Sequence, residues 1–122
     1  MAAPNIVSVT SIYGKTRGQP LTTGPAVGVL TCASDKVLKV NSIIVSNIDT
    51  TAAAGCTVTF YDSSTSTEYS LATSVSVPAQ STLVVIGKDS PIYLEESDEV
   101  RAGAQANDDL EVVVSFEELD DA

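Results

Sequence analysis

Four carboxylates lie within five consecutive positions of the stretch SPIYLEESDEVRAGA (residues 90–104): Glu95, Glu96, Asp98 and Glu99. Grouped carboxylates can act as a general acid and base, or supply oxygen ligands for calcium. Acid–base catalysis needs two carboxyl groups held across a cleft in environments that separate their pKa values, whereas these four are neighbours in sequence. The stretch also lacks the spacing of an EF-hand loop. We therefore expect a solvent-exposed acidic turn between two strands, with weak calcium binding as the alternative.

The other reactive residue types do not assemble a site. The chain has no histidine, which excludes a serine triad, a Cys–His nucleophile and a Cys/His zinc site. No SxxK pattern is present, and the letters GKT at 14–16 lack the GxxxxGK context of a phosphate-binding loop. We expect no catalytic, cofactor-binding or metal-binding residues, and no enzymatic activity.

The two cysteines, Cys32 and Cys56, have no CxxC spacing. Cys32 shares strand parity with Leu30, and Cys56 shares it with Val58 and Phe60, which predicts that both thiols face the core. Free thiols are expected in a reducing compartment, although the sequence leaves a disulfide between them open.

The charge is strongly negative and unevenly placed. The chain has 16 acidic and 6 basic residues, and the segment 89–122 holds 12 of the acidic ones against Arg101 alone. Nucleic-acid binding depends on lysine and arginine neutralising phosphates, so nucleic acid is not an expected partner. The acidic face is expected to keep the protein in solution, with a site for a basic partner as the alternative. No signal peptide and no run of 18 apolar residues is present, so we expect cytoplasmic synthesis and no membrane partner.

Apolar residues recur with the period of two that is typical of half-buried strands. Residues 69–77, 100–106 and 110–116 alternate in this way, and Tyr61, Tyr69 and Phe116 are predicted to face the core. The stretches VLKVNSIIVSN and TLVVIG are apolar on both parities, which indicates strands covered on both faces or packed at a subunit contact. No segment shows a capped helical pattern.

Turn-forming residues separate these runs at 14–20, 50–55, 63–66, 78–81 and 87–91. The turn at Asn107–Asp109 predicts that the last two strands form a hairpin. About eight short strands predict an all-β antiparallel β-sandwich, jelly-roll-like, with little or no helix. We expect an N-terminal strand or arm over residues 1–20 and a single β-sandwich domain over residues 21–122. The strand order is left open by the loop lengths.

Three stretches resemble small virion structural proteins of tailed bacteriophages, especially those of marine and cyanobacterial hosts: MAAPNIVSVTSIYGKT, KVLKVNSIIVSNID and VPAQSTLVVIGKDSPIYLEESDEVRAGAQANDDLEVVVSFEEL. In that family the C-terminal half runs from VPA through IYLEEGD to a last hairpin ending in SYEE. Here Ser97 replaces the usual glycine and Phe116 replaces the common tyrosine. Serine accommodates a positive φ less readily than glycine does.

The resemblance implies a jelly-roll-like domain mounted on the virion, as a head decoration (cement) protein or a neck or tail accessory. The implied partners are capsid or neck and tail subunits, together with other copies of the chain in a homo-oligomer. We expect an attachment segment that contains Pro4, Ile6, Val7, Val9 and Ile12, either as an ordinary edge strand or as an arm that pairs with a neighbouring subunit. A module that binds carbohydrate or a host surface is the alternative. Against it, the sequence has few aromatic residues outside predicted core positions, and sugar-binding surfaces usually need exposed aromatic rings.

Overall fold

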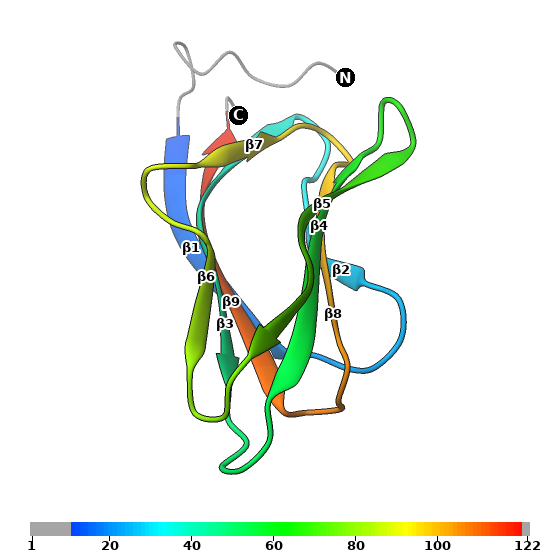
Figure 1. Cartoon of the computed structure of the whole chain (residues 1–122). Coiled ribbons are helices and arrows are strands. Elements are labelled where there is room, and N and C mark those ends of the chain that lie inside the picture. Colours follow the sequence, from blue (N-terminus) through cyan, green and yellow to red (C-terminus); the bar gives the residue numbers. More distant parts are fainter. Residues whose placement is uncertain (1–10, 121–122) are drawn as a thin grey trace.

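The computed structural model describes residues 11–120, in which nine β-strands and no helix are present (Figure 1). The strands are β1 (Ser11–Pro20), β2 (Val27–Thr31), β3 (Lys36–Asn47), β4 (Ala54–Asp62), β5 (Thr67–Val77), β6 (Thr82–Ile86), β7 (Ile92–Leu94), β8 (Glu99–Ala104) and β9 (Leu110–Asp120). The predicted all-β architecture is confirmed.

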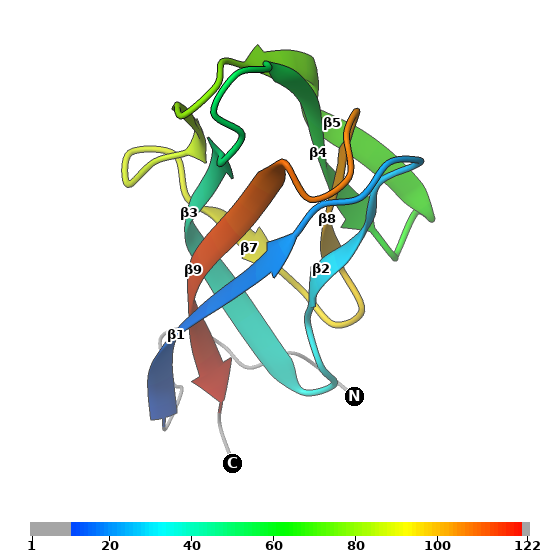
Figure 2. The same cartoon turned by 90° about the horizontal axis from the view of Figure 1, so that it is seen from below.

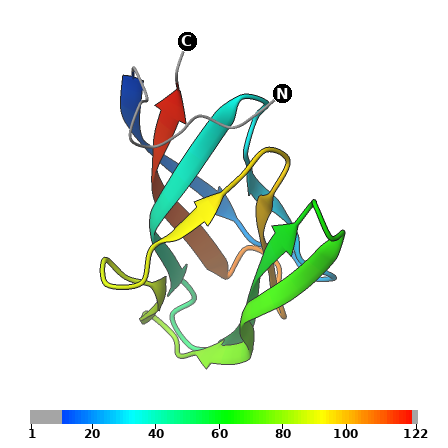
Figure 3. The same ribbon diagram turned by 90° about the horizontal axis from the view of Figure 1, so that it is seen from above.

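The strands form two antiparallel sheets that pack face to face as a β-sandwich (Figures 1 and 2). Sheet A has the order β1-β9-β3-β6, and the short β7 also pairs with β3 (Figure 3). Sheet B has the order β2-β8-β4-β5. Sheet A therefore ends at β1 and at β6 and β7, while sheet B ends at β2 and β5.

The antiparallel strand pairs are nested along the chain. β4 pairs with β5, β3 with β6, β2 with β8, and β1 with β9. The innermost pair is a hairpin, and each following pair joins strands that are further apart in sequence. The fold thus depends mainly on contacts between distant segments.

The core lies between the two sheets, and β3, β8 and β9 supply it largely with alternate residues, as the period of two predicts, whereas β1 buries none of its residues. Sheet A contributes mainly valine and leucine, and sheet B contributes several smaller side chains, such as alanine and cysteine. The fully buried or nearly buried residues include Val40, Ile43, Val45, Val112, Val114 and Phe116 from sheet A, and Leu30, Cys56, Val58, Val100 and Ala102 from sheet B. The predicted core positions of residues 100–104 and 110–116 are confirmed.

The predicted hairpin between the last two strands is wrong, because β8 lies in sheet B and β9 in sheet A. The residues between them cross from one layer to the other. The amide of Gln105 donates to the Gly55 carbonyl at 2.9 Å, and the amide of Asp108 donates to the Leu21 carbonyl at 3.0 Å. The turn residues therefore bond to the start of β4 and to the residue that follows β1, and do not close a two-stranded ladder.

The predicted turn at 14–20 is also wrong, since these residues continue β1 without interruption. β1 is an edge strand that pairs with β9 from Ser11 to Pro20. Glycine and proline are tolerated at an edge, because one side of the strand needs no ladder partner. Pro20 is the last residue of the strand.

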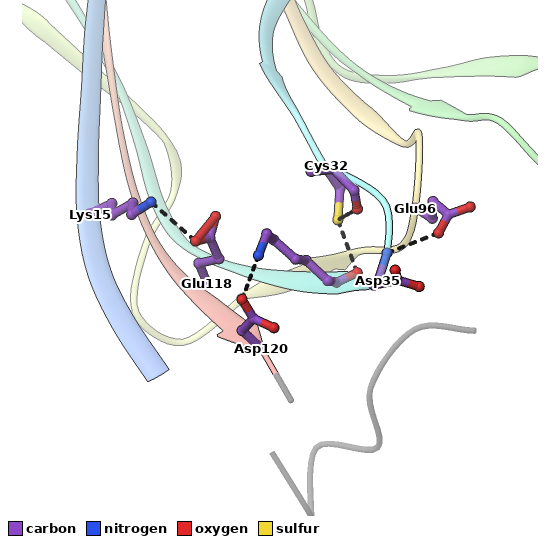
Figure 4. Close-up of polar contacts among 8 residues, drawn as sticks. Lys15, Cys32, Asp35, Glu96, Glu118 and Asp120 are labelled. Atoms are coloured by element: carbon purple, nitrogen blue, oxygen red, sulfur yellow. Dashed lines mark hydrogen bonds and ion pairs between the residues drawn. The ribbon is translucent and has the colours of Figure 1, made fainter. Parts of the chain in front are cut away.

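Both cysteines are buried free thiols, as predicted. The Cys32 thiol donates to the Lys36 carbonyl at 3.2 Å (Figure 4). Burial raises the pKa of each thiol from its ordinary value of 9.0 to about 11. The folded state therefore favours the protonated thiols.

We predict that both thiols are inert in the native protein and that they affect its stability in alkali. Because folding raises their pKa, their contribution is fully present below pH 9 and is lost as the pH rises toward 11. The loss should be on the order of 2 kcal/mol per thiol. Urea denaturation between pH 8 and pH 11 measures it, with the double variant Cys32→Ala/Cys56→Ala as the control. An equally steep decline in that variant would contradict the prediction.

Candidate functional site

The predicted acidic turn joins β7 to β8. The amide of Asp98 donates to the Glu95 carbonyl at 3.0 Å and closes a four-residue turn. Ser97 occupies the third position of this turn with a φ of +70°. Ser97 therefore has a left-handed backbone conformation, which glycine would adopt with less strain.

Asp98 is not part of an acidic surface, because it is only 5% exposed. One of its carboxylate oxygens accepts hydrogen bonds from the Ser63 amide at 3.0 Å and the Ser63 hydroxyl at 3.1 Å. The other accepts from the Glu95 amide at 3.0 Å. Asp98 thus links the β7–β8 turn to the β4–β5 turn. The expectation that all four carboxylates face solvent is wrong for Asp98, because two of its three donors come from Ser63, in a loop distant in sequence.

The other three carboxylates have separate surroundings. Glu96 accepts from the Asp35 amide at 3.0 Å (Figure 4), Glu99 accepts from Arg101 at 3.1 Å, and Glu95 is exposed. Across residues 11–120, no three acidic or cysteine side chains gather closely enough to hold a metal ion. The turn connects neighbouring loops through hydrogen bonds to Ser63 and Asp35, and its carboxylates do not converge on one point.

The outer face of sheet B carries a polar network centred on Arg101. Its guanidinium contacts Glu99 at 3.1 Å and Glu68 at 3.7 Å, and lies 4.0 Å from the centroid of the Tyr61 ring. The Thr59 hydroxyl donates to Glu68 at 2.6 Å. The hydrogen bond to Glu99 and the nearby negative charges raise the pKa of Arg101. The predicted core position of Tyr61 is wrong, because alternation along β4 turns Phe60 inward and Tyr61 outward.

The outer face of sheet A is different, since it carries an apolar row (Val84, Ile44 and Val113). Val84 of β6 lies opposite Ile44 of β3, and Ile44 lies opposite Val113 of β9. Val84 is 61% exposed and Val113 is 39% exposed. Gly18 of β1 lies next in line and leaves the side of Val113 open to a shallow hollow of about 260 Å³.

Hydroxyl-bearing residues flank the apolar row on both sides. Ser46 and Thr82 lie 3.2 Å apart on one side, and Ser115 and Thr16 lie 3.4 Å apart on the other. Within residues 11–120 no segment covers this face. Residues 11–120 therefore do not cover these strands on both faces, and packing at a subunit contact stays a prediction.

A second apolar surface is lined by residues of β4, β5 and β7. This apolar groove has a volume of about 160 Å³ and is lined by Phe60, Tyr69, Leu71, Ile92 and Tyr93. Tyr69 is 53% exposed, so its predicted core position is wrong. Tyr69 pairs with Phe60 within sheet B. The only strand of sheet A that lines the groove with them is β7, which has three residues and leaves Tyr69 partly uncovered. Sequence parity gave the correct face of β5 but could not reveal that the opposing sheet ends there.

Of the predicted attachment residues, Pro4, Ile6, Val7 and Val9 lie outside the described residues. Ile12 lies in β1 opposite Leu119 and is 59% exposed. Its neighbour Tyr13 is also exposed. The start of β1 therefore presents apolar side chains at the edge of sheet A.

The acidic end of β9 is partly neutralised by basic residues of the neighbouring strands. Lys15 of β1 contacts Glu118 at 3.1 Å, and Lys36 of β3 pairs with Asp120 (Figure 4). The hydrogen bond to Asp120 raises the pKa of Lys36. The negative end predicted from the sequence is thus interrupted by ion pairs along β9.

A pair of carboxylates that the sequence analysis missed lies at the opposite end of the sandwich. The Ile48 amide donates to the Asp109 carbonyl at 2.8 Å, which brings Asp49 and Asp109 together. Hydrogen bonds from the Thr51 and Ala52 amides lower the pKa of Asp49, whereas loss of solvation and the charge of Asp49 raise that of Asp109. Sixty residues separate the two positions in sequence, so no local pattern could have found the pair.

Comparison with protein-family models and with curated protein sequences found no match to this chain. Within the part that the structure describes, no helix is long and apolar enough to cross a membrane.

We predict that Asp98→Ala lowers the free energy of unfolding by about 2 to 4 kcal/mol, because three donors lose a buried, charged acceptor. Glu95→Ala is the matched control and should change it by less than about 0.5 kcal/mol, since its side chain is exposed. Urea denaturation of both variants measures the difference. Equal values for the two variants would show that Asp98 does not tie the turns together.

Proposed function

We propose that this chain is a non-enzymatic virion structural protein of a tailed bacteriophage, a decoration protein that attaches to the capsid and stabilises the particle. The observation that carries the proposal is the contrast between the two outer faces of the sandwich. Sheet A exposes an apolar row that nothing in residues 11–120 covers, whereas the polar groups of sheet B satisfy one another. A protein with one docking face and one solvent face suits a particle surface.

The connectivity supports the jelly-roll arrangement that the proposal assumes. A jelly roll results when one long antiparallel hairpin is wrapped into two sheets. If the short β7 is set aside, the eight remaining strands form four nested pairs, of which two lie in each sheet. We infer from this nesting that the sandwich is a jelly roll with β7 as an addition.

The surface chemistry supports attachment through sheet A and exposure of the remaining surface. The apolar row and its flanking hydroxyl groups carry no charge, and the exposed Glu111, opposite Ser46, lies at their border. An apolar centre with a polar border is typical of a protein contact surface. The net charge of −10 keeps coated particles apart in solution. The partners are then capsid subunits and further copies of this chain, and a position on the neck, tail or fibre is the alternative.

The test is rebinding of purified protein to particles that lack it, measured by co-sedimentation. Val84→Glu/Val113→Glu should weaken binding roughly tenfold or more, because charged groups would enter an apolar contact. Ser76→Glu is the control, since it adds a charge at an exposed position of β5. Binding by the double variant at the wild-type level would overturn attachment through sheet A. Failure of the wild-type protein to bind any part of the particle would overturn the proposed function.

Recognition of carbohydrate on a host surface is a second candidate, because Tyr69 and Tyr93 are exposed beside one another in the apolar groove. Exposed aromatic rings can stack on sugar faces. Titration with a panel of oligosaccharides, followed by NMR, should then shift the signals of both tyrosine rings. Unchanged ring signals with every sugar would remove this candidate.

A further inference from the structure

The apolar groove has the size of one large apolar side chain. Its volume of about 160 Å³ is close to that of a protein cavity of about 150 Å³ that binds one benzene ring. All five lining side chains are aromatic or aliphatic, and two phenol groups are their only polar atoms. Such a lining suits an apolar side chain better than a sugar, whose hydroxyl groups each need a hydrogen-bond partner.

An unpaired strand edge borders the groove. β5 is the last strand of sheet B, and among the described residues it pairs only with β4. β5 is continuous from Thr67 to Val77, but its register against β4 shifts at Leu71 and again between Ala72 and Val75, where Ser74 has a φ of +48°. Tyr69 and Leu71, in the first half of the strand, both line the groove. An added strand could therefore pair with β5 and place one side chain in the groove, which is how β-strand addition achieves both affinity and specificity.

We propose that this site binds residues 5–9 of a second copy of the chain, which pair with residues 67–72 and place an apolar side chain in the groove. The segment reads NIVSV, and three of its five residues are β-branched and apolar. Residues 2–10 contain no charged side chain, so the segment can approach a protein of net charge −10 without repulsion. The inference rests on the proposed function, for which it names the partner of the attachment segment.

A second copy fits the site better than the same chain does. Ser11 lies at the outer edge of sheet A, and β9 and β3 separate it from β7. The path to the groove crosses three strand spacings of about 4.8 Å and a sheet spacing of about 10 Å. The path is about 24 Å long, so about seven extended residues at roughly 3.4 Å each would be needed to cover it. Residues 4–10 would be used in the crossing, and only residues 1–3 would be left to pair with β5.

Self-association of the full chain, measured by sedimentation velocity over a range of concentrations, tests the proposal. Leu71→Asp places a charge in the groove, and Val7→Asp places one in the donated segment. Each variant should associate roughly tenfold more weakly than the wild type or worse. Ile48→Asp is the control, because Ile48 is also an exposed aliphatic residue (53%, against 37% for Leu71) but lies outside the groove. It should associate as the wild type does.

A mixture of the two variants provides the decisive result. Leu71→Asp retains an intact segment and Val7→Asp retains an intact groove, so the mixture should form dimers that neither variant forms alone. A synthetic peptide of residues 2–10 in excess should also dissociate the wild-type assembly. A wild-type protein that stays monomeric at every concentration, or a Leu71→Asp variant that associates normally, would overturn the inference.

The inference and the proposed function fail in different ways. If Leu71→Asp associates normally while the wild-type protein rebinds to particles, the segment has another partner and the proposed function stands. If the variants and their mixture behave as predicted but no particle is bound, the assembly is real and the proposed function fails.

Discussion

The antiparallel pairing of β3 with β9 is the constraint on which the rest of the structure depends. The two strands align from Lys36 and Asp120 to Asn47 and Leu110, which is the longest pairing in the molecule. Every other strand of sheet A pairs with one of these two and not with each other: β1 with β9, and β6 and β7 with β3. Their inward-facing valines and isoleucines form the floor on which sheet B packs. Because the paired residues are far apart in sequence, this ladder can form only when the chain has folded back on itself.

The two ends of the sandwich, on either side of this central pairing, are built differently. At one end, β7 covers only three residues of β3, so the inner face of β5 is left without a complete opposing sheet and the apolar groove opens. Close to it, Asp98 ties two turns together through buried hydrogen bonds to Ser63 and Glu95. At the other end, the loops that hold Asp49 and Asp109 are joined by a backbone hydrogen bond. The hydrogen bonds of Asp98 thus hold the turns close to the apolar groove in place.

The two outer faces of the sandwich differ in how well they suit contact with a partner. On sheet B, Arg101 with Glu99, Glu68 and Tyr61 forms a network whose charges are already compensated, so little is gained when a partner covers it. On sheet A, covering Val84, Ile44 and Val113 would remove apolar surface from water, and none of these three side chains carries a charge. Edge strand β5 adds a third surface, where backbone groups and apolar side chains are available together. Sheet A and the edge of β5 suit contacts with other proteins, whereas the outer face of sheet B suits exposure to solvent.

The sequence by itself determined the all-β class, the inward positions of residues such as Val112 and Val114, and the burial of Cys32 and Cys56. Each of these follows from the period-two alternation of side chains along a strand, which is a local property. Only the tertiary structure decided which strands pair, and so it alone placed β8 and β9 in different sheets and made residues 14–20 an edge strand. It also decided that Asp98 is buried while Tyr69 is exposed. Burial depends on what the rest of the chain places opposite a residue, and no alternation within a single strand contains that information.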